Sequence, residues 1–298
     1  MLSRLLVVAA TLLLAACGGS SSEAPTPTPT PAPEPTAEPT ATPRQCEGSS
    51  ALCDRRFDEV AWATTHNAYS NEEDGFIGPN QRYNVPRQLA DGVRGLMLDV
   101  YLVDGVVTQC HSLCDLGSRA LADTLAEIAT FLDENPDTIV SIIFESYVDG
   151  ETVAAEFDAA GLTALAHVQD PDESWPTLAE LLDAGSRLVV FTDRDGLARP
   201  WYLPVWDHAF ETHYSFEAPE DLDCAPNRGD TTNPLFIVNH FLTRGLGSPT
   251  FAEMVNYNPL LEDRVSECAE HNDAFPNFIT VDFHDIGDVL KVTDAWNE

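Results

Sequence analysis

The feature that most constrains the fold is a regular alternation, after residue 56, of short apolar runs with amphipathic segments. The runs are rich in β-branched and aromatic residues and too short for buried helices, so they predict strands. The expected strands are Val60–Thr65, Gly95–Leu102, Thr138–Tyr147, Arg187–Thr192, Glu211–Phe216, Leu235–Phe241 and Phe278–Phe283. The segments between them space apolar residues three and four positions apart, as amphipathic helices do. The expected helices are Leu121–Leu132, Val153–Ala160, Leu178–Ala184, Pro259–Glu270 and Val289–Trp296.

This alternation predicts an α/β fold with a mainly parallel sheet. Residues 46–298 also match the length of one α/β barrel, ~250 residues. The sequence has no GxGxxG after the first expected strand and no Walker motif, so a nucleotide-binding fold lacks its marker. We therefore predict a single-domain, distorted TIM (β/α) barrel of about seven or eight strands. An open doubly wound sheet is the alternative.

The first 45 residues predict export and tethering. Residues 1–16 begin with a basic residue and continue with an apolar run too short to span a bilayer, as in a secretory signal peptide. The small residues before Cys17 resemble the lipobox of bacterial lipoproteins, which implies cleavage there and lipidation of Cys17. Residues 17–45 contain eight prolines and are typical of an extended tether. We expect a protein anchored in the bacterial cell envelope through Cys17, with an ordinary signal peptide as the alternative.

The remaining cysteines agree with an oxidising compartment. Seven cysteines minus Cys17 leave six, an even number. Six cysteines allow fifteen pairings. Local spacing favours Cys46–Cys53 and Cys110–Cys114, which leaves Cys224–Cys268. A metal cluster is the alternative, disfavoured because the spacings are not those of paired zinc knuckles.

The charge of the chain excludes two classes of partner. It carries 49 acidic and 15 basic residues, a formal net charge of −34. A general nucleic-acid binder needs a basic face, and a protein that holds anionic lipid electrostatically needs a polybasic patch. We therefore expect no nucleic-acid partner.

Polar side chains gather where the expected strands end, and in α/β barrels this is where active sites lie. A single histidine after a strand is more often a structural hydrogen-bonding group, and a single terminal aspartate is often a helix cap. Several such residues at equivalent positions predict a shared site. The candidates are His66, Asn67, Asp99, His111, Glu145 and Asp282.

The residue types of this set suit chemistry at phosphorus. Two histidines can act as a base and an acid near neutral pH. Oxygen ligands from Asn67, Asp99 and Glu145 suit a hard cation such as Ca²⁺, whereas zinc would prefer histidine or cysteine. A base, an acid and a cation together fit an in-line displacement at a phosphodiester.

Four segments give the chain a family resemblance: Trp62–Ser70 (WATTHNAYS), Gln88–Tyr101 (QLADGVRGLMLDVY), Gln109–Ser112 (QCHS) and Pro276–Phe283 (PNFITVDF). Together they resemble the phosphatidylinositol-specific phospholipase C X-domain superfamily, above all its secreted or anchored PLC-like phosphodiesterases. The resemblance covers residues 55–298 and implies a distorted TIM barrel. It implies that His66 is the general base for the inositol 2-hydroxyl and His111 the general acid for the diacylglycerol leaving group. It also implies that Asn67, Asp99 and Glu145 bind Ca²⁺ and that a cyclic inositol phosphate forms.

The sequence departs from the family pattern at one position of the metal site. The Ca²⁺-dependent branch usually has an acidic residue where this chain has Met97, and the metal-independent branch has an arginine where Asp99 stands. Any Ca²⁺ site would thus keep three protein ligands and bind more weakly. Two further roles stay open: Arg94 either contacts phosphate or forms a structural ion pair, and Asp282 either orients His66 or caps the next helix.

These observations predict an exported phosphodiesterase that acts on phosphatidylinositol or a related lipid or soluble phosphodiester, as a monomer. A glycerophosphodiester phosphodiesterase is less favoured, because such enzymes would show His-Arg-Gly and Glu-x-Asp motifs where this chain has His66-Asn67 and Met97. A catalytically inactive lipoprotein that binds a lipid head group is the alternative from another class.

Overall fold

The computed structural model describes residues 44–298. The expected signal peptide (1–16), Cys17 and nearly all of the expected tether (17–45) lie outside the described residues. None of the helices between residues 44 and 298 is long and apolar enough to cross a membrane.

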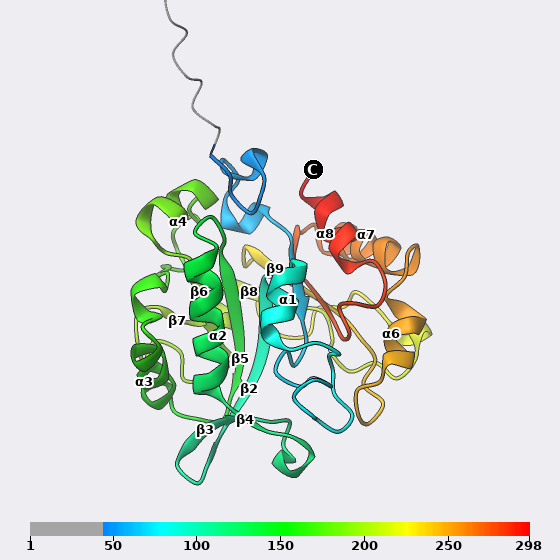
Figure 1. The fold of residues 1–298 in the computed structure, drawn as a ribbon. Coiled ribbons are helices and arrows are strands. Elements are labelled where there is room, and N and C mark those ends of the chain that lie inside the picture. Colours follow the sequence, from blue (N-terminus) through cyan, green and yellow to red (C-terminus); the bar gives the residue numbers. More distant parts are fainter. Residues whose placement is uncertain (1–43) are drawn as a thin grey trace, which may run out of the picture. The chain divides into compact units, whose positions relative to one another are not determined.

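The centre of the domain is a curled sheet of eight parallel strands in the order β7-β6-β5-β2-β1-β10-β9-β8 (Figure 1). The strands are β1 (Trp62–Thr65), β2 (Gly95–Val103), β5 (Val140–Ser146), β6 (Leu188–Thr192), β7 (Tyr202–Pro204), β8 (Ala209–Glu211), β9 (Leu235–His240) and β10 (Pro276–Val281). The sheet ends at β7 and β8, so it forms a distorted half-barrel. The predicted α/β barrel is confirmed in this open form.

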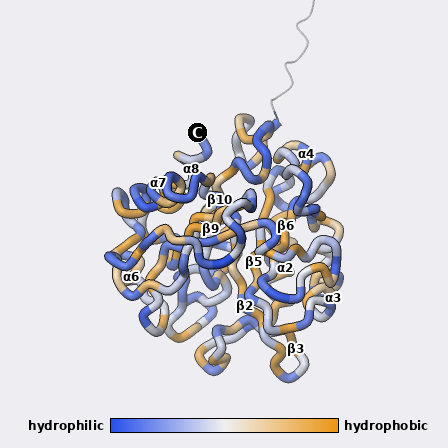
Figure 2. Tube along the Cα trace, turned by 180° about the vertical axis from the view of Figure 1, so that it is seen from behind, coloured by the Kyte–Doolittle hydropathy of each residue, from blue (hydrophilic) through white to orange (hydrophobic). Residues whose placement is uncertain are grey.

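Helices cover the outside of the sheet, with α2, α3 and α4 on one side and α6, α7 and α8 on the other (Figure 1). They are α1 (Val85–Asp91), α2 (Leu121–Glu134), α3 (Gly150–Ala160), α4 (Leu178–Ala184), α5 (Val205–His208), α6 (Pro249–Val255), α7 (Leu260–Asn272) and α8 (Val289–Trp296). The apolar stripe of α2 is fully buried at Leu121, Leu125, Ile128 and Leu132. The tube coloured by hydropathy shows the same pattern, with apolar strands inside polar helices (Figure 2).

Most expected elements are present, and the exceptions have physical reasons. An additional strand, β3 (Val106–Gln109), pairs antiparallel with β2 and with the short β4 (Arg119–Ala120). The strand expected at Glu211–Phe216 is wrong beyond its first residue, because β8 ends at Glu211. Its alternating pattern belongs to a loop, and Phe216 packs with Leu242 and Val255 in a small separate cluster.

All three favoured disulfides are present: Cys46–Cys53, Cys110–Cys114 and Cys224–Cys268. The first fixes the start of the described chain, the second holds the loop after β3, and the third ties the loop after β8 to α7. The two that flank the carboxyl ends of strands constrain loops near the expected site.

Aromatic side chains fill part of the interior of the half-barrel. Buried rings of Phe57, Trp62, Trp175, Phe191 and Phe278 belong to one packed cluster. The carboxyl ends open into a cavity of about 300 Å³, whose wall includes apolar side chains of that same cluster, such as Ile143 and Ile237. The site therefore lies on a rigid apolar floor.

Candidate active site

His66 lies directly after β1 at the mouth of the half-barrel. Asn67, in a left-handed conformation with φ of 47°, turns the chain there. Asp282, directly after the neighbouring strand β10, places Oδ1 2.9 Å from His66 Nδ1. Asn80 holds that carboxylate by donating from Nδ2 to both oxygens, at 3.2 and 3.1 Å. The imidazole is thus oriented by a carboxylate that is itself fixed.

Opposing influences act on the pKa of His66. Burial disfavours its charged form, but the attraction of Asp282, helped by Asp99 and Glu145, outweighs this and raises the pKa of His66. Phe241 stacks parallel to the imidazole, with 4.0 Å between ring centroids. A hydrogen bond from Nδ1 to Asp282 leaves Nε2 to exchange a proton with a ligand, and Asn67 Nδ2 lies 3.2 Å from Nε2.

His111, in the loop after β3, faces the same cavity as His66. Partial loss of water around the ring, followed by the charge of His66, lowers the pKa of His111. The two histidines also line a second, smaller cavity of about 60 Å³. Two histidines whose pKa values are shifted in opposite directions therefore face one cavity.

Asp99 and Glu145 are neighbours on adjacent strands, paired in the register of β2 and β5. Burial, followed by repulsion from Glu145, raises the pKa of Asp99 to about 7. The buried hydroxyl of Tyr69 donates to Asp99 Oδ2 at 3.2 Å and lies 3.4 Å from Asn67 Oδ1. Glu145 accepts a hydrogen bond from the Tyr147 hydroxyl. The three predicted oxygen donors therefore come from neighbouring elements.

These donors fit a hard cation only in part. Two carboxylates that repel one another would gain from a positive charge between them. Between residues 44 and 298, however, no group of three His, Cys, Asp or Glu side chains has a metal-binding arrangement. Met97 lines the cavity and offers no oxygen. The side chains suit a weak, water-completed Ca²⁺ site better than a tight one.

Sequence reasoning missed an ion pair that lines the same cavity, between Arg228 and Glu211. Arg228 donates from Nε to Oε1 of the buried Glu211 at 2.6 Å and lies over the rings of Trp206 and Tyr214, at 4.5 and 4.7 Å. Asn239 Nδ2 donates to the other oxygen of Glu211 at 2.9 Å. Glu211 ends β8, so a strand placed two residues earlier would have revealed it. Arg228 is in a loop, where no periodic pattern marks it.

Arg94 is not brought to this site. It lies at the amino end of β2, where its Nε binds Glu47 Oε2 at 2.7 Å and its Nη1 donates to the carbonyls of Leu89 and Val93. The structure therefore gives Arg94 the ion pair that was the alternative to phosphate contact.

Comparisons with known proteins identify the family of this chain. A family model for the PI-PLC X domain matches residues 52–297. A PI-PLC X domain-containing protein 1 of Arthroderma benhamiae is 30% identical over 280 residues, which cover 85% of this chain and 89% of that protein. A PI-PLC X domain-containing protein of Arabidopsis thaliana is 29% identical over 81% of this chain and 62% of its own length. An uncharacterized secreted protein of A. benhamiae is also 29% identical, over 83% of this chain and 61% of that one.

Solved structures show the same fold. The phosphatidylinositol-specific phospholipase C of Listeria monocytogenes matches with a TM-score of 0.59 at 14% identity, over 83% of this chain and 96% of that one. An enzyme of the same type from Staphylococcus aureus gives 0.56 at 12%, over 83% of this chain and 95% of that one. The fold and the strand-end site define a phosphodiesterase-like α/β barrel. The chain belongs to the PI-PLC X-domain family.

Proposed function

We propose that this protein is an exported phosphoric diester hydrolase of the phosphatidylinositol phospholipase C type. The observation that carries the proposal is the His66–Asp282 pair, which faces His111 across one cavity at the mouth of the half-barrel. A histidine oriented by a carboxylate and a second histidine on the same cavity suit cleavage of a phosphodiester by internal attack.

The residues supply both proton transfers of such a reaction. His66 Nε2 removes the proton of a hydroxyl next to the phosphodiester, and the oxygen attacks phosphorus. The bond from phosphorus to the leaving oxygen breaks as His111 gives that oxygen a proton. The product is a cyclic phosphate and, for phosphatidylinositol, diacylglycerol. Water can open the cyclic phosphate with the two histidines in exchanged roles. Asp282 keeps the His66 ring oriented throughout.

Arg228 is a candidate for the group that contacts the substrate's phosphate or hydroxyls. It is the one arginine among the described residues that line the main cavity, and its ion pair with Glu211 leaves further N–H groups to donate. This role fits a substrate with a single phosphodiester better than a polyphosphorylated lipid, which would need more positive charge.

Asn67, Asp99 and Glu145 would hold Ca²⁺. When bound, the ion would neutralise charge on the phosphoryl oxygens. If Ca²⁺ binds the folded protein, it should raise the melting temperature with concentration, because a ligand of the native state stabilises it by mass action. Melting curves in EDTA and in millimolar Ca²⁺ measure this without substrate, and identical curves would remove Ca²⁺ from the proposal.

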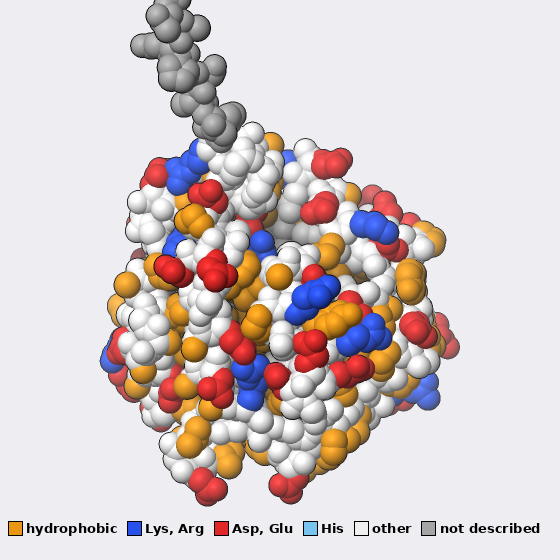
Figure 3. All heavy atoms as spheres, viewed as in Figure 1, with side chains coloured by type: hydrophobic (Ala, Val, Ile, Leu, Met, Phe, Trp, Pro, Cys, Tyr) orange, Lys and Arg blue, Asp and Glu red, His pale blue; other side chains and the backbone are white. Residues whose placement is uncertain are grey.

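The distribution of exposed apolar side chains supports an assembled lipid as the substrate. Of the twelve large, exposed hydrophobic residues among those described, nine lie in the β2–β3 hairpin or in loops at the mouth end. They are Ile77, Leu102, Val103, Val106, Leu113, Tyr147, Leu197, Tyr214 and Leu246. We call them the apolar rim. The face in view carries both acidic and basic side chains, with the acidic ones more numerous (Figure 3), as in the whole sequence with its 49 acidic and 15 basic residues. The rim and this charge favour a lipid surface without net negative charge.

Anchoring through a lipidated Cys17 in the bacterial cell envelope is part of the proposal. It would hold the enzyme near lipid and remove the need for electrostatic attachment. Mass spectrometry of the mature protein tests it: a diacylglyceryl Cys17 at the new amino terminus is expected, and an unmodified terminus elsewhere would contradict it.

Purified full-length protein, assayed on phosphatidylinositol dispersed in a zwitterionic lipid, with EDTA or Ca²⁺, tests the activity. Release of diacylglycerol is expected. No release in either condition, together with calorimetric binding of inositol or its phosphate, would favour an inactive head-group-binding lipoprotein. Cleavage of glycerophosphodiesters alone would favour a glycerophosphodiester phosphodiesterase.

A further inference from the structure

Arg264 of α7 is a buried cation whose guanidinium is held mainly by backbone carbonyls. Its exposed fraction is 4%. Burial lowers the pKa of Arg264 to about 10, although Asp223 and Glu267 attract its charge. Burying a charge is costly for stability unless other groups compensate for the lost water. The contacts of Arg264 show which parts of the fold this buried charge connects.

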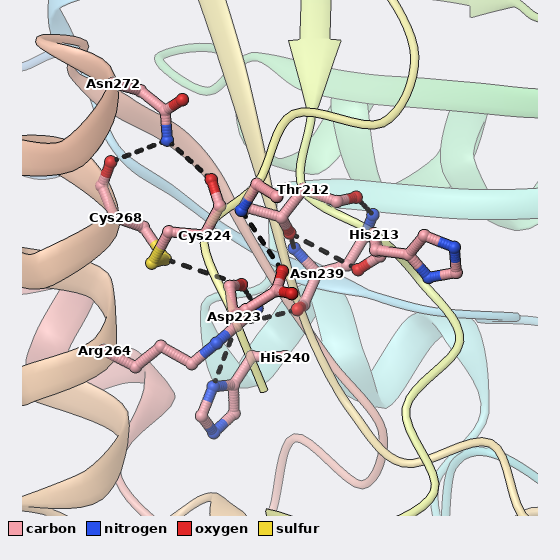
Figure 4. Close-up of a disulfide and its surroundings, with 10 residues drawn as sticks. Thr212, His213, Asp223, Cys224, Asn239, His240, Arg264, Cys268 and Asn272 are labelled. Carbon is pink, nitrogen blue, oxygen red and sulfur yellow. Dashed lines mark hydrogen bonds between the residues drawn. A yellow bond between two sulfur atoms is a disulfide. The ribbon is translucent and has the colours of Figure 1, made fainter. Parts of the chain in front are cut away.

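Arg264 joins two separate segments (Figure 4). Its Nη1 donates to the carbonyl of Asn239 at 2.8 Å and lies 3.3 Å from Nδ1 of His240, at the end of β9. Its Nη2 donates to the carbonyl of Asp223 at 2.8 Å, in the loop after β8. His240 Nε2 lies 2.8 Å from the carbonyl of Val255, which sets the proton on Nε2 and leaves Nδ1 to accept from Arg264.

The Cys224–Cys268 disulfide links the same helix, α7, to the same loop. We call these connections of α7 to the Asp223–Cys224 segment the tie. Cys268, one turn after Arg264, is bonded to Cys224, the residue after Asp223. Asn272, one turn further, donates from Nδ2 to the carbonyls of Cys224 and Cys268, both at 3.0 Å. Residues spaced by four lie on one stripe of a helix. One stripe of α7 therefore holds the Asp223–Cys224 segment by a covalent bond and by hydrogen bonds (Figure 4).

Both segments that Arg264 joins lead to the candidate active site. The side chain of Asn239 holds Glu211, which binds Arg228. Phe241, two residues after Asn239, stacks on His66. The loop between β8 and Arg228 is tied to α7 at Asp223 and Cys224. The positions of Arg228 and Phe241 at the cavity thus depend on how α7 holds these two segments.

We propose that Arg264 and the Cys224–Cys268 disulfide are positioning residues for the substrate-binding wall that carries Arg228 and Phe241. This inference rests on the proposed function. Because the wall is held before substrate arrives, binding does not have to order the loop, and ordering a loop weakens affinity. Releasing the tie should raise KM by about tenfold while kcat falls by less than about threefold.

The test compares two pairs of cysteine substitutions in the full chain. Cys224→Ala/Cys268→Ala removes the tie, and Cys46→Ala/Cys53→Ala removes a disulfide at the far end of the barrel. Both variants should be less stable, so kinetics are measured well below their melting temperatures. We expect KM to rise only in the first variant. An unchanged KM there, or equal changes in both variants, would overturn the inference.

Hydrogen–deuterium exchange gives a reading that needs no turnover. Amides of residues 212–228 should exchange faster in Cys224→Ala/Cys268→Ala than in the parent, and at the parent's rate in the control pair. Unchanged exchange would overturn the inference even if the protein is active. An inactive parent would instead count against the proposed function, and the exchange comparison would still decide whether the wall is held by this tie. Arg264→Lys, which keeps the charge but cannot reach both carbonyls, should show the same direction of change as the disulfide variant.

Discussion

The two ends of the half-barrel use the same residue types in opposite ways. At the amino ends of the strands, Arg94 pairs with Glu47 at 2.7 Å, and further bonds to backbone groups satisfy both side chains. At the carboxyl ends, Asp99 and Glu145 stand side by side on adjacent strands with like charge. At the amino end each of these charges has a partner of opposite sign, although burial still raises the pKa of Glu47. The carboxyl end keeps like charges together where substrate or a cation could relieve the repulsion, as functional sites do.

The largest expected effect is a loss of activity on substitution of a residue at the mouth of the half-barrel. His66→Ala should lower kcat by about 10²–10⁴-fold, because general base catalysis contributes that much. His271→Ala, at an exposed position on α7, is the matched control and should change kcat by less than twofold, a surface change of this kind being close to neutral. Diacylglycerol release measures both. A fall in kcat of less than tenfold in His66→Ala would show that His66 is not the general base.

The opposite pattern is expected at the amino end. Glu47→Gln should lower the free energy of unfolding by about 3 kcal/mol, because it leaves the Arg94 charge without its partner in a largely buried place. Its kcat and KM should match the parent at 25 °C. Urea denaturation measures the free energy of unfolding, and the lipid assay measures kcat and KM. A loss of activity without a loss of stability would contradict the assignment of Glu47 to stability alone.

The like charges at the mouth predict a pH-dependent stability with a definite sign. Because the pKa of Asp99 in the folded protein is raised from 3.8 to about 7, the folded state binds this proton more tightly than the unfolded chain. Above pH 7 the charged carboxylate therefore opposes folding, and this penalty fades as the pH falls through 7 toward 4.

Asp99→Asn has no such charge, so in EDTA it should be more stable than the parent by about 2 kcal/mol at pH 8, with a smaller difference at pH 5. Denaturation at both pH values measures this. A parent more stable than the variant at pH 8 would show that Asp99 is not under electrostatic strain.

The smallest effect concerns the apolar rim. Leu102→Asn should raise the apparent KM for phosphatidylinositol in zwitterionic vesicles by about fivefold, because one apolar side chain contributes roughly 1–2 kcal/mol at an interface. Val168→Asn is the matched control: the two residues are similarly exposed, 54% and 56%, but Val168 lies at the amino end. An equal rise in KM in both variants, or an equal rise for a soluble substrate, would show that the apolar rim does not bind lipid.

Much of this arrangement could be predicted from local patterns. The apolar run 138–147 and the helical spacing of Val289–Trp296 each specify an element by themselves, and both are present. His66 and Asp282 were predicted to lie together because each stands at the carboxyl end of an expected strand. That β1 and β10 are neighbours, which brings their side chains to 2.9 Å, depends on long-range packing.

What could not be predicted is mostly a matter of loops and strand ends. A shift of two residues in the start of β8 hid Glu211, since strand ends are the least defined part of a periodic pattern. Arg228 and Asn80 reach the site from loops, which have no periodicity to place them. Arg94 belongs to a recognisable motif, yet it precedes its strand and so lies at the end away from the mouth.

The central claim is that the mouth of the half-barrel cleaves a phosphodiester by acid–base catalysis through a cyclic phosphate. The most direct measurement is a ³¹P NMR time course of phosphatidylinositol with the full-length protein, beside His66→Ala and His111→Ala. The account predicts a cyclic inositol phosphate signal that appears first in the parent, with both variants slowed by about 10²-fold or more. An acyclic phosphate as the first product, or a parent with no signal beyond that of the variants, would contradict it.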